Sequence, residues 1–143
     1  MKKRYFIFLL WALVSCKKDN ARPLSEQIQK VWQAGVVKEG AITVFTKGAA
    51  SNAKPGYSQY RLDLSSPTLV KLTDFDANTF AGTWELSADQ KMLILKGLSP
   101  QPSGTNGLIE FSIGSASDKT LTITRLTASV KTGGTINTYD LTN

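Results

Sequence analysis

Hydrophobic and polar residues follow two different patterns along the chain. Residues 24–30 (LSEQIQK) are the candidate for a helix, with Ser25 able to cap its N-terminus and Glu26 in its first turn. From Val31 onward apolar and polar residues alternate, as in the segment 60–65 (YRLDLS). Alternation with a period of two is typical of half-buried antiparallel strands. The pattern therefore predicts one short helix followed by antiparallel β-structure.

Turn-forming residues separate the apolar runs at regular intervals. Two examples are Lys54-Pro55-Gly56 and Gly133-Gly134, which contain the residues that favour turns. Short strands of even spacing imply a barrel or a sandwich. The runs predict about nine strands, at residues 31–37, 41–47, 57–65, 68–73, 79–87, 91–96, 107–114, 119–126 and 134–141.

The N-terminus has the features of a targeting segment. Met1 to Arg4 is basic, and Tyr5 to Val14 (YFIFLLWALV) is an apolar run of ten residues. Such a run is shorter than the roughly 20 residues of a membrane-spanning helix and suits the apolar region of a secretory signal peptide. We expect residues 1–15 to be a signal peptide.

The end of this segment resembles a lipid-attachment motif. Leu13-Val14-Ser15-Cys16 resembles the lipobox of bacterial lipoproteins, in which cleavage precedes the cysteine and the cysteine is acylated. The resemblance implies that acyl chains on Cys16 bind the protein to a membrane, and that residues 16–23 form a lipidated stalk. The alternative is an ordinary signal peptide with an incidental cysteine.

Lys17, which follows Cys16, gives an indication of the membrane in which the protein is anchored. By resemblance to lipoprotein sorting signals, Lys17 stands where an aspartate is associated with inner-membrane retention. This implies an outer-membrane lipoprotein of the bacterial cell envelope. The sequence leaves open whether the protein is periplasmic or surface-exposed.

Composition excludes several kinds of catalysis. The chain has no histidine, and Cys16 is its single cysteine. Ser-His-Asp and Cys-His catalysis, histidine-ligated metals and internal disulfides are therefore excluded. Carboxylates such as Asp63 and Glu110 have no spacing that sets two of them across a pocket, as glycoside hydrolysis requires. We expect a protein that is not an enzyme and that has no cofactor.

Charge argues against nucleic acid as a partner. The formal net charge is +6, but Lys2, Lys3 and Arg4 belong to the expected signal peptide, which leaves +3. The remaining cations are scattered along the chain, with no cluster beyond Lys17-Lys18. A nucleic-acid interface requires basic residues gathered on one face, so we expect none here.

A segment in the middle of the chain carries a family resemblance. Residues 82–95 (GTWELSADQKMLIL) resemble the Gly-x-Trp hairpin of small bacterial lipoproteins with a lipocalin-like domain. The resemblance covers roughly residues 24–143, although Lys30 stands where the first-strand Gly-x-Trp of classical lipocalins would place glycine. It implies an all-β fold, namely an antiparallel up-and-down (meander) barrel of about eight to nine strands with a short N-terminal helix.

A barrel of this size holds either its own side chains or one small ligand. Inward alternation would gather five large rings, which belong either to the core or to a ligand site: Phe45, Tyr60, Phe80, Trp84 and Phe111. We expect a non-catalytic binding module for a small apolar or amphipathic ligand. The alternative is a surface interaction or structural lipoprotein, contacting a glycan or a protein, whose barrel is filled by its own side chains. An interior cavity of about 300 to 1,000 Å³ would favour the ligand.

Arg125 is expected to point inward, by alternation from Leu121 and Ile123. In lipocalins a similarly placed arginine packs across the first-strand tryptophan and closes one end of the barrel, and here that tryptophan would be Trp32. A guanidinium over an indole ring is stabilising. Two alternatives are a bulge that returns Arg125 to solvent and an arginine that binds an anion in an open pocket.

One segment partly matches a calcium loop. Asp74, Asp76, Asn78 and Glu85 fit positions 1, 3, 5 and 12, which supply oxygen ligands. Thr79 replaces the glycine that the sharp turn requires at position 6, and the flanking segments are predicted strands. We therefore expect a hairpin turn at residues 74–78 and no metal site.

Overall fold

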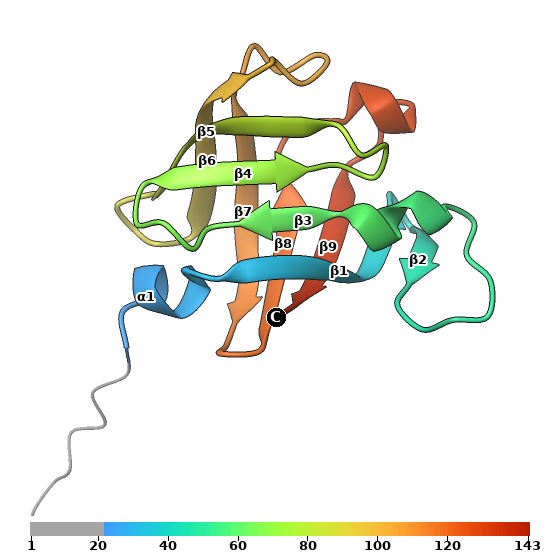
Figure 1. The fold of residues 1–143 in the computed structure, drawn as a ribbon, viewed down its shortest axis with the longest axis horizontal. Coiled ribbons are helices and arrows are strands. Elements are labelled where there is room, and N and C mark those ends of the chain that lie inside the picture. The colour runs from blue at the N-terminus through green and yellow to red at the C-terminus, as the bar shows by residue number, and fades with distance from the viewer. Residues whose placement is uncertain (1–21) are drawn as a thin grey trace, which may run out of the picture.

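The computed structural model describes residues 22–143 (Figure 1). The expected signal peptide and Cys16 lie outside the described residues. Within residues 22–143, no helix is long and apolar enough to cross a membrane.

The described chain consists of one short α-helix, nine strands and two 3₁₀-helices. Their bounds are α1 (Leu24–Ile28), β1 (Val31–Glu39), β2 (Ile42–Thr46), η1 (Pro55–Gln59), β3 (Arg61–Asp63), β4 (Leu69–Thr73), β5 (Thr79–Leu86), β6 (Met92–Ser99), β7 (Ile109–Ala116), β8 (Thr120–Arg125), η2 (Val130–Thr132) and β9 (Asn137–Thr142).

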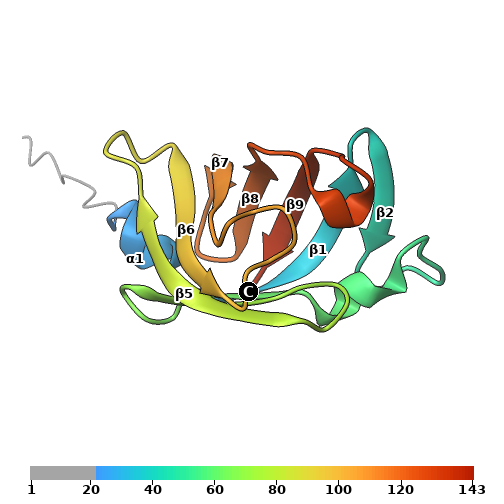
Figure 2. The same cartoon turned by 90° about the horizontal axis from the view of Figure 1, so that it is seen from above.

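The strands form a closed antiparallel barrel. From β3 to β9 each strand pairs with the next one along the chain, and β1 pairs with both β3 and β9. This ring contains eight strands, and the view from above shows the sheet curling round on itself (Figure 2). The extra strand, β2, pairs with the second half of β1. The predicted all-β meander barrel with a short N-terminal helix is confirmed.

A bulge in β1 helps to close the barrel. The pairing of β1 with β9 skips a residue between Ala34 and Val36, where Gly35 lies. A Cβ added to Gly35 would lie only 2.9 Å from the carbonyl oxygen of Asp140. A side chain would therefore clash with β9. Bulges of this kind bend a strand and increase its twist.

One predicted strand is wrong in part. Residues 57–65 were expected to be one strand, whereas η1 occupies residues 55–59 and β3 only residues 61–63. Pro55 begins η1, in agreement with the preference of proline for the first position of a helix. Tyr57 is fully buried and anchors η1 to the core. The apolar alternation at Tyr60, Leu62 and Leu64 is real, because all three side chains are buried.

The two ends of the barrel are built differently. At one end, which we call the closed end, α1 lies beside the turns at residues 64–68, 87–91 and 117–119 (Figure 1). The opposite end, which we call the mouth, carries η1, the turn at 74–78, the loop at 100–108 and the segment 126–136 that contains η2. The chain alternates between the two ends because successive strands are antiparallel.

Candidate functional site

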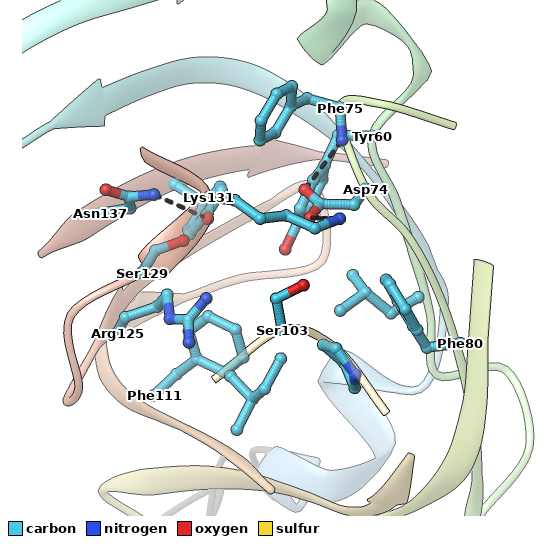
Figure 3. Close-up of a pocket in the computed structure, with 14 residues that line it drawn as sticks. Tyr60, Asp74, Phe75, Phe80, Ser103, Phe111, Arg125, Ser129, Lys131 and Asn137 are labelled. Atoms are coloured by element: carbon cyan, nitrogen blue, oxygen red, sulfur yellow. Dashed lines mark hydrogen bonds and ion pairs between the residues drawn. The ribbon is translucent and has the colours of Figure 1, made fainter. Parts of the chain in front are cut away.

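The mouth contains a cavity of about 20 Å³ (Figure 3). Its walls combine the rings of Tyr60, Phe80, Phe111 and Tyr139 with polar side chains that include Arg125. A volume of about 10 to 15 Å³ on this scale holds one water molecule, so the cavity is far smaller than the 300 to 1,000 Å³ of ordinary ligand sites. The remaining interior is filled by side chains of the hydrophobic core.

Arg125 enters the cavity from the last position of β8, beside Phe111 of β7. Its Nε atom is buried and has no hydrogen-bond partner. Within residues 22–143, no carboxylate forms an ion pair with Arg125. Buried polar groups in folded proteins are nearly always hydrogen-bonded. Arg125 is therefore a donor for which the described chain provides no acceptor.

Two stacked tyrosines form a second part of the cavity wall. The rings of Tyr60 and Tyr139 lie 4.8 Å apart with an interplanar angle of 18°. Burial raises the pKa of Tyr139 to about 12 and raises that of Tyr60 well above its usual value, although the positive charge of Arg125 lowers both. Both hydroxyls therefore keep their protons at neutral pH and are able to donate a hydrogen bond.

The hydroxyl of Tyr60 makes no hydrogen bond to any of residues 22–143, although the residue is only 2% exposed. Among these residues, Nε of Arg125 is the one fully buried side-chain nitrogen or oxygen without a partner, so the hydroxyl of Tyr60 keeps some contact with open space. Tyr139 differs, because its hydroxyl accepts a hydrogen bond from Nδ2 of Asn137 at 3.4 Å. Tyr60 and Arg125 thus present two unused donors to the same small space.

Lys131, by contrast, is held by two carboxylates. Its Nζ donates to Oδ2 of Asp76 at 2.7 Å and to Oδ2 of Asp74 at 3.2 Å, and it lies 5.2 Å from the ring centroid of Phe80. Burial alone would lower the pKa of Lys131, but these contacts outweigh it and raise the pKa. Burial would raise the pKa of Asp76, but hydrogen bonds from Lys131 and Asn78 outweigh it and lower the pKa.

A second charge pair joins the end of β1 to the residue that precedes η1. Glu39, at the end of β1, is 8% exposed and accepts hydrogen bonds from Nζ of Lys54 at 2.6 and 2.8 Å. It also accepts one from the hydroxyl of Tyr57 at 2.8 Å. The lysines of the mouth are thus each bound to carboxylates, whereas Arg125 is not.

The structure divides the five predicted rings into two groups. All five are buried, as the alternation predicted. Tyr60, Phe80 and Phe111 line the cavity. Phe45 lies outside it on β2, with its ring 6.3 Å from that of Tyr57. Trp84 lies toward the closed end, where its Nε1 donates to the carbonyl of Ser66 at 2.8 Å. The pattern identified inward positions, but only three of them meet at one place.

The predicted packing of Arg125 across Trp32 is wrong. Both β1 and β8 pair with β9 and run in the same direction, so the start of β1 is level with the start of β8. Trp32 is near the start of β1, whereas Arg125 is the last residue of β8. The cation over the indole ring is Lys30, whose Nζ lies 5.9 Å from the ring centroid. Trp32 closes one end of the barrel without Arg125.

The four residues that matched a calcium loop do not come together. Asp74, Asp76 and Asn78 form the turn between β4 and β5, with Lys131 bound to both aspartates. Glu85 lies near the other end of β5 and pairs with Lys96. Among residues 22–143, no group of three histidine, cysteine, aspartate or glutamate side chains is placed to hold a metal ion.

Sequence reasoning did not identify several residues of the mouth. Alternation could have predicted Tyr139 as an inward residue, because Asn137, Tyr139 and Leu141 alternate in the last strand and are all buried. No local pattern could have identified Lys131, because its partners lie 55 and 57 residues away in the sequence. Contacts of this kind arise only when the barrel closes.

No protein-family model matches the chain, and no curated protein matches it. Among solved structures, the chain is similar to an uncharacterized protein from Bacteroides eggerthii DSM 20697, with a TM-score of 0.46 and 12% sequence identity. The match covers 80% of this chain and 97% of that chain. A likeness this distant carries no argument about function, so the mouth has to be interpreted from its own chemistry.

Proposed function

We propose that the protein is a lipid-anchored, non-catalytic recognition module of the bacterial outer membrane, with a lipocalin-like barrel filled by its own side chains. The supporting observation is the contrast between an interior cavity of about 20 Å³ and the unused donors that face it. A filled barrel has no room for a ligand of ordinary size inside it. Recognition then takes place at the mouth.

The expected membrane attachment fits this arrangement. Acyl chains on Cys16 would tether the protein through the segment that precedes Arg22. Arg22 forms an ion pair with Asp118 in the turn at 117–119, which belongs to the closed end. A tether that leaves from the closed end keeps the mouth away from the anchoring point and accessible to a partner.

The charges at the mouth favour binding over catalysis. Glu39 is bound by Lys54, and Asp74 and Asp76 are bound by Lys131. General acid-base catalysis needs a carboxylate that is free to exchange a proton with a substrate. Carboxylates committed to lysines in this way hold loops together, and we assign them a structural role.

A second candidate is the binding of a small apolar or amphipathic ligand within the barrel. The observation in its favour is that Tyr60, Phe80 and Phe111, three of the predicted rings, line the cavity. Such binding would require these rings to move apart and enlarge the space more than tenfold. The packed interior makes it the weaker of the two candidates.

Nuclear magnetic resonance with the isotope-labelled full chain in detergent tests the proposal. Soluble and detergent-extracted fractions of the source envelope are added, and amide shifts are followed at the mouth and at the closed end. We expect shifts around Ser103 and Arg125 and none around the turn at 87–91. Changes confined to the closed end, or an absence of changes with every fraction, would contradict the proposal.

A pair of matched variants sharpens this experiment. Ser103 lines the cavity and is exposed, and Ala88 is exposed in a turn of the closed end. Ser103→Trp should obstruct the mouth and abolish the shifts caused by an active fraction. Ala88→Trp places the same bulk at the other end and should leave them unchanged.

A further inference from the structure

We propose that the mouth binds the carboxylate group of a small organic acid, with Arg125 and Tyr60 as its hydrogen-bond donors. This inference rests on the proposed function, because it names the chemical group that the mouth recognises.

A buried donor without an acceptor lies at the cavity. The Nε atom of Arg125 is buried and unpartnered. The hydroxyl of Tyr60 lines the same cavity and makes no hydrogen bond to any described residue (Figure 3). A buried unpartnered donor beside a second free donor indicates a partner that accepts hydrogen bonds.

Charge favours an anion as this partner. Lys54 and Lys131 at the mouth are bound to carboxylates of the described chain, whereas the partly exposed Arg125 is not. A water molecule would fit the cavity and accept a hydrogen bond from Nε, but it carries no charge to pair with the guanidinium. An anion supplies both the acceptor and the charge.

Shape favours a carboxylate over a phosphate. A guanidinium presents its donors in a planar fork that matches the two oxygens of a carboxylate. The cavity of about 20 Å³ can enclose only the end of a ligand, and the two oxygens of a carboxylate need less room there than the oxygens of a tetrahedral phosphate. Asp74 also lines the cavity, and its charge opposes a dianion more strongly than a monoanion. A carboxylate therefore fits these conditions better than a phosphate does.

The position of the opening decides how such an acid would lie. Ser103 is exposed and lines the cavity, whereas Phe80 and Phe111 are buried in its walls. The carboxylate would face Arg125, and the rest of the acid would leave the protein past Ser103. Because only the acidic end is enclosed, the smallest carboxylates are suitable probes.

Acetate, acetamide and chloride are the probes for the experiment. The purified full chain is titrated in detergent at constant ionic strength, and both the melting temperature and the Nε–H resonance of Arg125 are recorded. Acetate should raise the melting temperature and shift the resonance, because a ligand of the native state stabilises it. Acetamide has the same shape without the charge and should have no effect.

Variants identify the donors. Arg125→Gln should weaken acetate binding by about tenfold or more, because a charge-assisted contact is lost. Tyr60→Phe keeps the ring and should weaken binding by about tenfold, as expected for the loss of one hydrogen bond to a charged acceptor. Arg61→Gln is the matched control: Arg61 lies in β3, does not line the cavity, and donates to the carbonyl of Tyr60 at 3.3 Å. It should bind acetate like the wild type.

Several results would overturn the inference. Equal responses to acetate and chloride would reject a carboxylate in favour of an unselective ion site, and equal responses to acetate and acetamide would reject the role of charge. Unchanged acetate binding in a folded Arg125→Gln variant would reject the site, and so would no response to acetate in the wild type. If envelope fractions still perturb the mouth in that case, recognition at the mouth stands. If they do not, both proposals fail.

Discussion

The closed end and the mouth close the same barrel by opposite means. At the closed end Trp32 is fully buried, and its Nε1 donates to the carbonyl of Ile28 at 2.8 Å. At the mouth charged side chains converge, and Arg125 has no partner among the described residues. An unsatisfied buried donor lowers stability by about 1 to 3 kcal/mol. The closed end therefore satisfies its buried polar group, whereas the mouth keeps an unpartnered donor at a cost in stability, a trade-off that the proposed binding role would explain.

The largest expected effect concerns the tether. Under the proposed function, Cys16→Ala should abolish membrane association and leave the melting temperature of the barrel unchanged, because the proposed acyl chains are carried by Cys16 and not by residues of the barrel. Acyl labelling followed by detergent phase partitioning measures the first effect, and thermal denaturation measures the second. A variant that still partitions with the membrane would show that the tether has been misassigned.

The next largest effect concerns the closed end. Trp32→Ala should lower the free energy of unfolding by about 3 to 5 kcal/mol, because it leaves a cavity in a fully packed region. Trp32→Phe, which keeps a ring there, should lose less. Chemical denaturation of both variants gives the values. A loss below about 1 kcal/mol for Trp32→Ala would show that α1 and its neighbours do not carry the stability of this end.

At the mouth a substitution should change the free energy of unfolding in the opposite direction. Arg125→Met keeps a long apolar side chain and removes the unpaired charge, so it should raise the free energy of unfolding by about 1 to 2 kcal/mol. Denaturation is measured without added carboxylates, since a bound acid would stabilise the wild type. Destabilisation by Arg125→Met would mean that the guanidinium has a structural role, and the contrast between the two ends would be lost.

The smallest effect concerns pH. The pKa of Asp76 is lowered in the folded protein, so its contribution is present above the unfolded value of 3.8 and is lost as the pH falls through the lower folded value. The pKa of Lys131 is raised, so its contribution is present below 10.5 and is lost as the pH rises beyond the folded value. Thermal denaturation below pH 4 should therefore show a small loss that Lys131→Met reduces. An identical acid profile in the variant would exclude this contribution.

Most of the fold could be predicted from the sequence, because alternation and turn residues are local features of the chain. Alternation with a period of two and regular turns predicted nine strands, and the structure contains nine. The error at residues 57–65 also has a local cause: Tyr57 has the apolar character of a strand residue, but Pro55 begins a 3₁₀-helix. Burial of Tyr57 in the core is compatible with either backbone, so the apolar pattern could not distinguish them.

The mouth was harder to predict because alternation specifies the face of a strand and not its level along the barrel. The pattern placed both Trp32 and Arg125 on the inner face, but their opposite levels follow from the registers of β1 and β8 against β9. The partners of Lys131 are likewise set by the juxtaposition of segment 126–136 and the turn at 74–78.

The sequence by itself determined the inward and outward faces, the turns and the absence of histidine chemistry, because each depends on residue type and local spacing. Only the tertiary structure decided which inward residues meet, how little space they leave, and that Nε of Arg125 is buried at the cavity without a hydrogen-bond partner. These properties depend on strand register and barrel closure, which join residues far apart in the chain. For that reason the candidate site became visible only in the closed barrel.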